Sequence, residues 1–221
     1  MNKLKNYLWI VLLTYMFMSL IFVNKLGYLA LICMFAPIFI APFAGRKWCG
    51  SFCPRGSFLD KLVIKFSRNK DIPPLLLNTA FRWTIFGLLM SFFVFQVINA
   101  WGNWNKIGLV IASMVFMTTI IATIVGIFWR PRTWCVAFCP MGTLATSLST
   151  TEGGIIFDQG CVSCGLCSRS CPMQLNTARF NIEGRVTDPR CIRCGECISN
   201  CPKNILSEEL ANGKLKERLA N

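Results

Sequence analysis

Histidine is absent from this chain of 221 residues, and charged residues are scarce. Without histidine the protein cannot hold a haem through a proximal imidazole, a Rieske centre or any other His-ligated metal. Charged residues make up 15% of the chain and hydrophobic residues 54%, whereas soluble domains carry roughly 25% charged residues. The shortage of charge therefore argues against an ordinary soluble globule.

Acidic side chains are the rarer sign of charge, with 10 Asp and Glu against 23 Lys and Arg. Residues 1–155 hold 14 basic and 3 acidic side chains, so 11 of the 13 net positive charges lie in the most hydrophobic part of the chain. A nucleic-acid-binding role is a weak explanation for charges that flank apolar segments. Glycine-rich nucleotide loops and Ser/His or Cys/His nucleophile pairs are missing too, and no catalytic residue is assigned.

Four uncharged stretches of 19 to 23 residues are present, each close to the length of about 20 residues that a bilayer requires. They cover residues 6–24, 26–45, 83–105 and 107–129. A cleaved signal peptide does not explain the first one, because hydrophobic sequence resumes at Leu26. We predict an α-helical integral membrane protein with four transmembrane helices in two pseudo-symmetric hairpins.

The basic residues predict the orientation of these helices. Twelve Lys and Arg precede the first stretch, lie between the second and third, or follow the fourth, while only Lys25 and Lys106 lie at the other ends. The positive-inside rule places the richer side in the cytoplasm. We therefore expect a multi-pass protein of the cytoplasmic (inner) membrane of a prokaryote, with both termini inside.

Twelve of the thirteen cysteines lie in four short clusters, and two of these clusters share the run C-x2-C-x2-C-x3-C-P. This run is typical of bacterial ferredoxins, in which the fourth Cys ligates the other of two [4Fe–4S] clusters. One [4Fe–4S] cluster is thus assigned to Cys161, Cys164, Cys167 and Cys201. The second is assigned to Cys191, Cys194, Cys197 and Cys171. Zinc is a poor alternative, since structural zinc pairs are single CxxC units.

The other two cysteine clusters form an internal repeat with an offset of 86 residues. RKWCGSFCPRGSFLDKL begins at Arg46 and RTWCVAFCPMGTLATSL begins at Arg132. Each copy follows an even-numbered hydrophobic stretch, so both should lie at the cytoplasmic membrane surface. A pseudo-two-fold axis would bring together the four cysteines of the two motifs, namely Cys49, Cys53, Cys135 and Cys139.

Three interpretations of these four cysteines compete. They ligate an additional Fe–S cluster, they bind a single metal or form a disulfide, or they are structural. Nearby arginines, Arg46 and Arg132 among them, would stabilise thiolates and a negatively charged cluster. The thirteenth cysteine, Cys33, is expected to be a small buried hydrophobic residue.

The combination of paired CxxxCP motifs after membrane helices with a two-cluster ferredoxin run resembles the NapH/NosR-type membrane polyferredoxin family. The resemblance implies a membrane domain over residues 1–154, a small α+β ferredoxin domain over 155–206 and a polar tail over 207–221. It also implies electron transfer that serves a partner redox enzyme, often discussed as quinol oxidation. The chain lacks the long flavin-bearing domain of the larger members, so its partner is not specified.

We therefore expect an iron–sulfur electron-transfer subunit that acts between a cytoplasmic or quinol donor and partner redox subunits. Two [4Fe–4S] clusters, an additional cluster at the CxxxCP motifs and a quinone are the expected cofactors. A soluble ferredoxin is a further candidate partner, and nucleic acid is not. The alternative is a maturation or redox-regulatory ferredoxin that serves assembly of a metalloenzyme.

Overall fold

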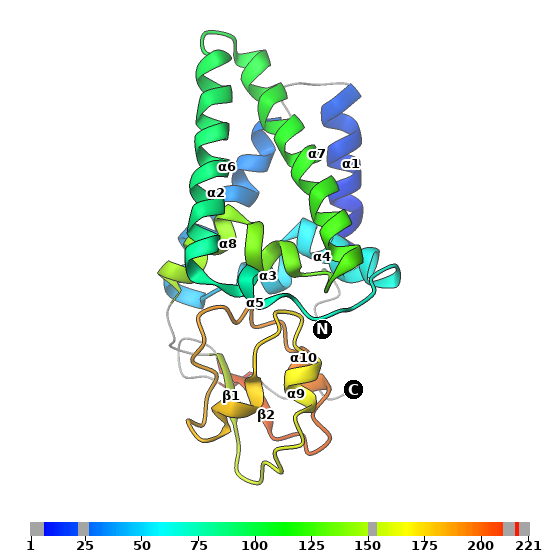
Figure 1. The fold of residues 1–221 in the computed structure, drawn as a ribbon, viewed down its shortest axis with the longest axis vertical. Coiled ribbons are helices and arrows are strands. Elements are labelled where there is room, and N and C mark those ends of the chain that lie inside the picture. Colours follow the sequence, from blue (N-terminus) through cyan, green and yellow to red (C-terminus); the bar gives the residue numbers. More distant parts are fainter. Residues whose placement is uncertain (1–6, 22–26, 150–153, 210–214, 217–221) are drawn as a thin grey trace.

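The computed structural model describes residues 7–21, 27–149, 154–209 and 215–216 of the chain. It has a helical part and a smaller part built from loops, short helices and a sheet (Figure 1). Both parts belong to one elongated molecule, with the long helices at one end and the small sheet at the other. The described chain is mostly helical, as the composition predicts.

Two helices are long and apolar enough to cross a membrane, α6 (Thr79–Asn99) and α7 (Trp104–Phe128). The side chain of Asn78 begins α6 by accepting a hydrogen bond from the amide of Ala80 at 3.0 Å, as a helix cap does. Arg82 is the buried residue of α6, while large apolar side chains such as Phe92 face outward. A helix with its apolar residues on the outside is suited to contact with lipid rather than with water.

The first two predicted spans form shorter apolar helices, α1 (Leu8–Ile21) and α2 (Leu29–Ala44). Pro37 and Pro42 lie inside α2, where each removes a backbone donor. Residues 22–26 between the two helices lie outside the described chain. Two of the four predicted spans thus have full membrane length in the structure, and the four-span arrangement stays a prediction.

Short helices follow α2 and α7 and contain the repeated motifs. The first copy forms α3 (Lys47–Ser51) and α4 (Pro54–Lys61), followed by a 3-10 turn η3 (Val63–Lys65). The second copy forms a π-helical turn η4 (Trp134–Phe138) and α8 (Pro140–Leu148). Helix α4 packs against α1 and α7, while α8 packs against α6 and α2. Each motif therefore contacts both hairpins, as pseudo-two-fold symmetry requires.

The smaller part contains a three-stranded antiparallel sheet in the order β1 (Gly154–Phe157), β2 (Leu206–Glu209) and β3 (Leu215–Lys216). The short helices α9 (Leu166–Arg169), η5 (Thr177–Asn181) and α10 (Glu196–Ser199) lie between β1 and β2 in sequence. Strand β1 also bridges to Arg185 through Ile156. The sheet extends into residues that the sequence assigned to the polar tail.

One hydrophobic core joins the two parts of the molecule. It contains Leu59 and Val63 from the first motif, Trp134 from the second, and Met173 and Ile192 from the cysteine-rich part. All five side chains are almost fully buried. Burial of large apolar side chains stabilises each by about 1.5–3 kcal/mol, so the cysteine-rich part is packed onto the base of the helices rather than tethered to it.

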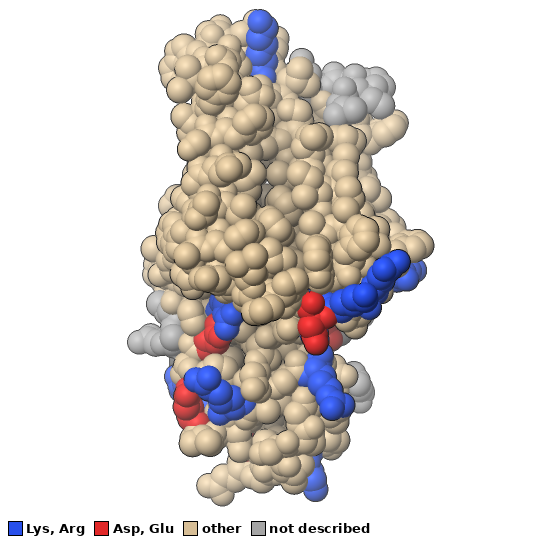
Figure 2. Space-filling view, viewed as in Figure 1, with Lys and Arg blue, Asp and Glu red and all other residues tan. Residues whose placement is uncertain are grey.

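A short apolar helix, α5 (Pro74–Leu77), leads from this base into α6. Figure 2 shows that charged side chains gather around the base and the cysteine-rich part. A broad uncharged surface covers the helices above them, and a basic side chain marks the opposite end. This distribution is typical of a membrane-embedded segment with a polar domain on one side.

Candidate iron–sulfur centres

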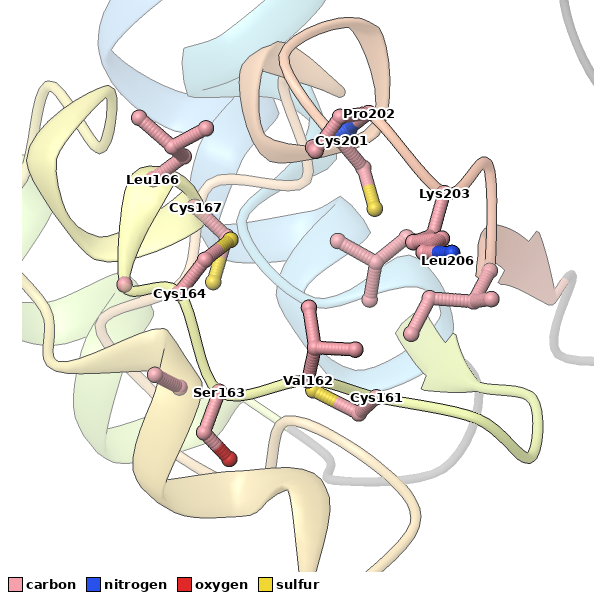
Figure 3. Close-up of a pocket in the computed structure, with 13 residues that line it drawn as sticks. Cys161, Val162, Ser163, Cys164, Leu166, Cys167, Cys201, Pro202, Lys203 and Leu206 are labelled. Atoms are coloured by element: carbon pink, nitrogen blue, oxygen red, sulfur yellow. The ribbon is translucent and has the colours of Figure 1, made fainter.

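The four cysteines assigned to the first ferredoxin cluster line one pocket. Cys161, Cys164 and Cys167 come from the first run, and Cys201 comes from the end of the second. Their sulfur atoms point toward a common space (Figure 3). The pocket measures about 380 Å³, including solvent space at its mouth, and apolar side chains such as Leu206 line the rest of its wall. The fourth cysteine is thus supplied by the other run, as the motif predicts.

A second pocket gathers the complementary set of cysteines. Cys191, Cys194 and Cys197 of the second run line it together with Cys171, the last cysteine of the first run. Its volume is about 350 Å³, again including space at its mouth, and buried apolar residues such as Met173 surround it. The structure therefore exchanges the fourth cysteine in both directions.

The backbone of the two runs repeats with an offset of 30 residues. Gly165 and Gly195 have φ angles of 74° and 79°, and both precede a four-residue helix. Ser163 and Arg193 have the equivalent left-handed φ angles of 53° and 51°. Alternating left-handed residues turn successive backbone N–H groups into a concave, anion-binding surface that is common at Fe–S sites. The repeated backbone suits two similar negatively charged clusters.

Burial raises the pKa of the thiols that line the second pocket. It raises the pKa of Cys191 to about 11 and that of Cys194 to about 12, against the opposing effect of the Arg193 and Glu196 backbone amides. Burial also raises the pKa of Cys171. Since iron binds the thiolate, cluster assembly must displace a proton from each of these ligands.

The donor set fits [4Fe–4S] clusters better than single metal ions. In a cubane each of the four cysteines binds a different iron, so the sulfur atoms surround the cluster at its corners. Within the described residues no three metal-ligating side chains converge on one point closely enough to hold a single ion. None of the thirteen cysteines, all of which lie among the described residues, forms a disulfide.

The two CxxxCP motifs have matching local geometry. The second cysteine of each motif, Cys53 or Cys139, caps a helix with an extended backbone (φ −68°, ψ 115° and φ −71°, ψ 114°). The proline after it occupies the first helical turn, where its missing N–H costs nothing. In both copies the tryptophan stacks on the phenylalanine four residues later, with ring centroids 5.6 Å apart. The repeat in the sequence is thus a repeat in structure.

Two arginines connect the motifs reciprocally. Arg46 of the first copy donates from Nη2 to the carbonyl oxygen of Cys135 in the second, at 3.3 Å. Arg132 of the second copy donates from Nη1 to the carbonyl oxygen of Cys49 in the first, at 2.8 Å. Both guanidinium groups are almost fully buried, with 1% exposure. The arginine that begins each motif therefore donates a hydrogen bond to the backbone of the first cysteine in the other motif.

The two motifs differ in the side chains that surround these arginines. Arg132 forms a bidentate ion pair with Asp60, at 2.8 and 2.7 Å. The position equivalent to Asp60 is Thr146, which accepts a hydrogen bond from Arg82 instead. The Nε atom of Arg46 is buried and has no hydrogen-bond partner among the described residues. An uncompensated buried cation beside four cysteines favours a negatively charged group between them.

A large cavity lies where the motifs meet the apolar helices. It measures about 1030 Å³, including its open mouth, and its wall includes all four motif cysteines and the arginines Arg46, Arg55 and Arg132. Apolar residues of α1 and α2 line much of the remainder, together with Val115 of α7 and Met141 of α8. The buried indole nitrogens of Trp48 and Trp134 lack partners among the described residues. The cavity thus has a basic, sulfur-bearing floor and an apolar wall.

Burial also raises the pKa of three cysteines of the CxxxCP motifs. It raises the pKa of Cys139 to about 12 and raises those of Cys53 and Cys135. The charge of Arg132 opposes this rise at Cys135 and at Cys53. Bound iron would provide the stronger opposing charge, because it binds the deprotonated thiol. The residues present therefore fit an Fe–S cluster.

The structure brings together each set of cysteines that the sequence grouped. Cys33, expected to be buried, is instead exposed and lines the large cavity. The sequence did not identify Asp60 as the partner of Arg132 or Gly50 as a contact with the cysteine-rich part. The differences between the two repeats, Asp60 against Thr146 and Gly50 against Val136, are the signal that could have found them.

Two family models match the chain. One, described as a 4Fe-4S binding domain, matches residues 26–73 and 109–149, which are the two CxxxCP repeats with the helices before them. The other, described as a 4Fe-4S dicluster domain, matches residues 153–202. These matches support an iron–sulfur, ferredoxin-like protein.

Two proteins of Methanocaldococcus jannaschii, both described as uncharacterized, are similar to the chain. The first is 28% identical over 152 residues, which cover 59% of this chain and 60% of the relative. The second is 29% identical over 148 residues, which cover 62% of this chain and 56% of the relative. The chain thus spans less than two thirds of the length of these relatives. No solved structure matches the chain.

Proposed function

We propose that this protein is a membrane-bound electron-transfer subunit of the NapH/NosR polyferredoxin type. Its ferredoxin part would hold one [4Fe–4S] cluster on Cys161, Cys164, Cys167 and Cys201, and another on Cys171, Cys191, Cys194 and Cys197. Cys49, Cys53, Cys135 and Cys139 would hold an additional Fe–S cluster at the membrane surface. The clusters supply one-electron chemistry when bound, and the protein sets their positions and surroundings.

One observation carries this proposal: all four CxxxCP cysteines line one cavity that is floored by buried arginines. Arg46 and Arg132 hold the backbones of Cys135 and Cys49 in place by reciprocal hydrogen bonds. Cys135 belongs to the core that contains Cys171 and Ile192 of the ferredoxin part, and Cys49 packs against this core. A set of ligands placed between an apolar helical layer and a ferredoxin is suited to passing electrons between them.

The membrane setting is supported by the outward apolar faces of α6 and α7 and by the position of the charges. In this proposal α1 and α2 complete a four-span bundle. Pro37 of α2 is buried among its neighbours, as interrupted backbone at membrane depth requires, whereas Pro42 is exposed near the end of the helix. The ferredoxin part packs on the base of the helices, and on the face shown in Figure 2 charged side chains gather around this base. The positive-inside rule makes that side cytoplasmic.

A membrane quinol is the donor that the cavity supports best. Apolar residues of α1 and α2, such as Leu12 and Met34, form its upper wall, while Arg55 and the motif cysteines form its floor. Ligand sites of this type combine an apolar lining with a few converging polar groups. A quinol head group could thus approach the CxxxCP cysteines from the bilayer. The partner redox subunits would accept the electrons on the cytoplasmic side.

Iron and acid-labile sulfide in anaerobically purified protein test the proposal. Two cubanes require about eight irons per chain, and a third cubane would raise this to about twelve. Cys49→Ser and Cys135→Ser should each remove only the iron above eight and leave the ferredoxin spectrum unchanged. Cys33→Ser is the matched control, since Cys33 lines the same cavity outside the motifs and should retain all iron.

A short-chain quinol added to the protein in liposomes supplies the second measurement. Quinol should reduce the ferredoxin clusters in the wild-type protein, whereas in a Cys53→Ser, Cys139→Ser variant only dithionite should do so. If the CxxxCP substitutions change neither iron content nor the rate of quinol-dependent reduction, the membrane-side cluster does not exist and the proposal is wrong.

A further inference from the structure

The first CxxxCP motif touches the ferredoxin part at a glycine. A side chain on Gly50 of α3 would overlap the carbonyl oxygen of Ile192 and lie 3.4 Å from the Cα of Cys194. In the second repeat the equivalent residue is Val136, which is buried in the core. The two repeats therefore differ at the position where one of them meets the ferredoxin backbone. Only the absence of a side chain permits this approach.

Arg46 reinforces the same contact from one side. Besides its bond to Cys135, its Nη1 donates to the carbonyl oxygen of Arg190, at 3.4 Å. A single buried guanidinium thus joins the second CxxxCP motif to the residue that precedes Cys191. Lys47 adds an ion pair to Glu208 of β2, at 2.5 Å.

The other side of the junction is held through Cys171. Arg130, which precedes the second motif, donates from Nη1 to the carbonyl oxygen of Cys171 at 2.9 Å. Its Nη2 pairs with Asp71, and the amide of Ile72 donates to the side chain of Gln174 at 2.7 Å. The base of the helices therefore contacts the ferredoxin on both sides of the pocket lined by Cys171, Cys191, Cys194 and Cys197.

Among the described residues, the other four ferredoxin cysteines are not part of the core that joins the ferredoxin to the helices. Cys167 and Cys201 pack with Cys197 and Leu206 in a separate hydrophobic cluster. Cys191 packs against both clusters and so lies between them. The loop from β1 to the first run forms the end of the molecule opposite the helices (Figure 1).

We call the contact that Gly50 and Arg46 make with the ferredoxin backbone the Gly50–Arg46 junction. We infer that this junction sets the sequence in which the clusters exchange electrons. The cluster that Cys171, Cys191, Cys194 and Cys197 would hold lies next to the CxxxCP site and would exchange electrons with it. The cluster that Cys161, Cys164, Cys167 and Cys201 would hold is then the outer one, facing the soluble partner. Each step between clusters would move one electron, oxidising one cluster and reducing its neighbour, with no bond made or broken. A quinol is the reductant: it gives up two electrons in two such steps, releases two protons as its O–H bonds break and becomes a quinone. A cytoplasmic redox protein is the oxidant. Arg46 acts here as a positioning residue. The inference rests on the proposed function.

Gly50→Ala tests the junction, with Gly87→Ala as the matched control because nothing lies within 4 Å of a side chain at Gly87. Hydrogen–deuterium exchange of residues 190–194, which needs no electron transfer, should speed up in Gly50→Ala and not in Gly87→Ala. Quinol-dependent reduction should slow by about tenfold or more, because a displacement of about one ångström can cost up to about a hundredfold. Iron content and reduction by dithionite should not change.

Arg46→Lys gives a second test if Gly50→Ala does not fold. It keeps the positive charge but loses the planar fork that joins the two carbonyl groups. The same faster exchange at residues 190–194 and slower quinol-dependent reduction are expected. If the variant that folds shows unchanged hydrogen–deuterium exchange at residues 190–194 and an unchanged rate of quinol-dependent reduction, the proposed role of the junction is wrong.

Freeze-quench EPR on the wild-type protein tests the order itself. Cys171→Ser and Cys201→Ser serve only to assign the signals of the two ferredoxin clusters. After mixing with quinol, the signal that Cys171→Ser alters should appear before the one that Cys201→Ser alters, and the reverse order would overturn the inference. If quinol reduces neither cluster in the wild type, the proposed function fails, while hydrogen exchange still decides whether the junction exists.

Discussion

Arg132 and Asp60 form an ion pair in which one partner is fully buried and the other partly so. The side chain of Arg132 is 1% exposed and that of Asp60 is 20% exposed. Desolvation lowers the pKa of Arg132, but the charge and hydrogen bonds of Asp60 outweigh it, so the pKa lies well above its usual value. The guanidinium is therefore charged at any physiological pH. Its orientation toward Cys49 depends on the carboxylate that holds it.

Replacing Asp60 by Asn should destabilise the protein strongly, because it leaves a buried cation without its counter-charge. We expect the free energy of unfolding to fall by about 3–5 kcal/mol, the usual cost of breaking a buried pair. Denaturant unfolding in detergent micelles measures the change.

Asp71→Asn provides the comparison for this prediction. Asp71 also pairs with an arginine, Arg130, but its side chain is 74% exposed. Exposed pairs contribute about 0–1 kcal/mol, so this substitution should be nearly neutral. Equal effects of the two substitutions would show that the Arg132–Asp60 pair is no more than a surface contact.

Among the elements, the cysteine-bearing loops were the most predictable from sequence. The spacing of the ferredoxin runs dictates that the chain turns back on itself before each proline, and Cys171 and Cys201 accordingly lie in each other's pockets. The offset of 86 residues likewise predicts the paired motif helices, which the structure contains as α4 and α8. Contacts between distant elements, such as α3 with the Ile192 loop, have no periodic pattern and could not be predicted.

The exchange of cysteines between the runs has a spectroscopic consequence. Cys201→Ser should alter the cluster that the first run holds, although Cys201 belongs to the second run. Cys171→Ser should alter the other cluster. A shift of the reduction midpoint by tens of millivolts or a loss of about four irons is expected in each case.

The test of this exchange is a pair of double substitutions measured by EPR. Cys201→Ser combined with Cys164→Ser should damage one cluster only, whereas Cys201→Ser combined with Cys194→Ser should damage both. If Cys201 and Cys194 together affect a single cluster, each run holds its own cluster and the exchanged assignment is wrong.

At the scale of the whole molecule, charge and apolar surface divide the protein into an apolar helical part and a polar part. The sequence predicted this division from the positions of Lys and Arg, and Figure 2 shows the charges gathered at the base. The prolines in the second stretch, Pro37 and Pro42, indicate an irregular span and both lie inside α2, but an uncharged stretch does not reveal where a helix ends. Helix α2 has 16 residues, and it ends at Ala44 so that Arg46 can turn into the site.

The orientation can be measured with topology reporters. A cytoplasm-active reporter fused after Asn221 or inserted in the loop of residues 68–71 should be active, since twelve basic residues retain these segments inside. A periplasm-active reporter should work near Lys25 or Trp104. Activity of the periplasmic reporter after Asn221 would overturn both the four-span arrangement and the cytoplasmic placement of the ferredoxin part.

The reciprocal hydrogen bonds of the two arginines also determine when the CxxxCP site can form during synthesis of the chain. Each motif is held by the arginine of the other, and the two arginines are 86 positions apart in the chain. At a synthesis rate of about 5–20 residues per second, the first motif waits roughly 4–17 s for its counterpart. During that interval its thiols have neither their full set of neighbours nor the Arg132 charge. In the proposed function, loading of the CxxxCP cysteines would therefore follow synthesis of the second repeat, which would make this site one of the last parts of the protein to mature.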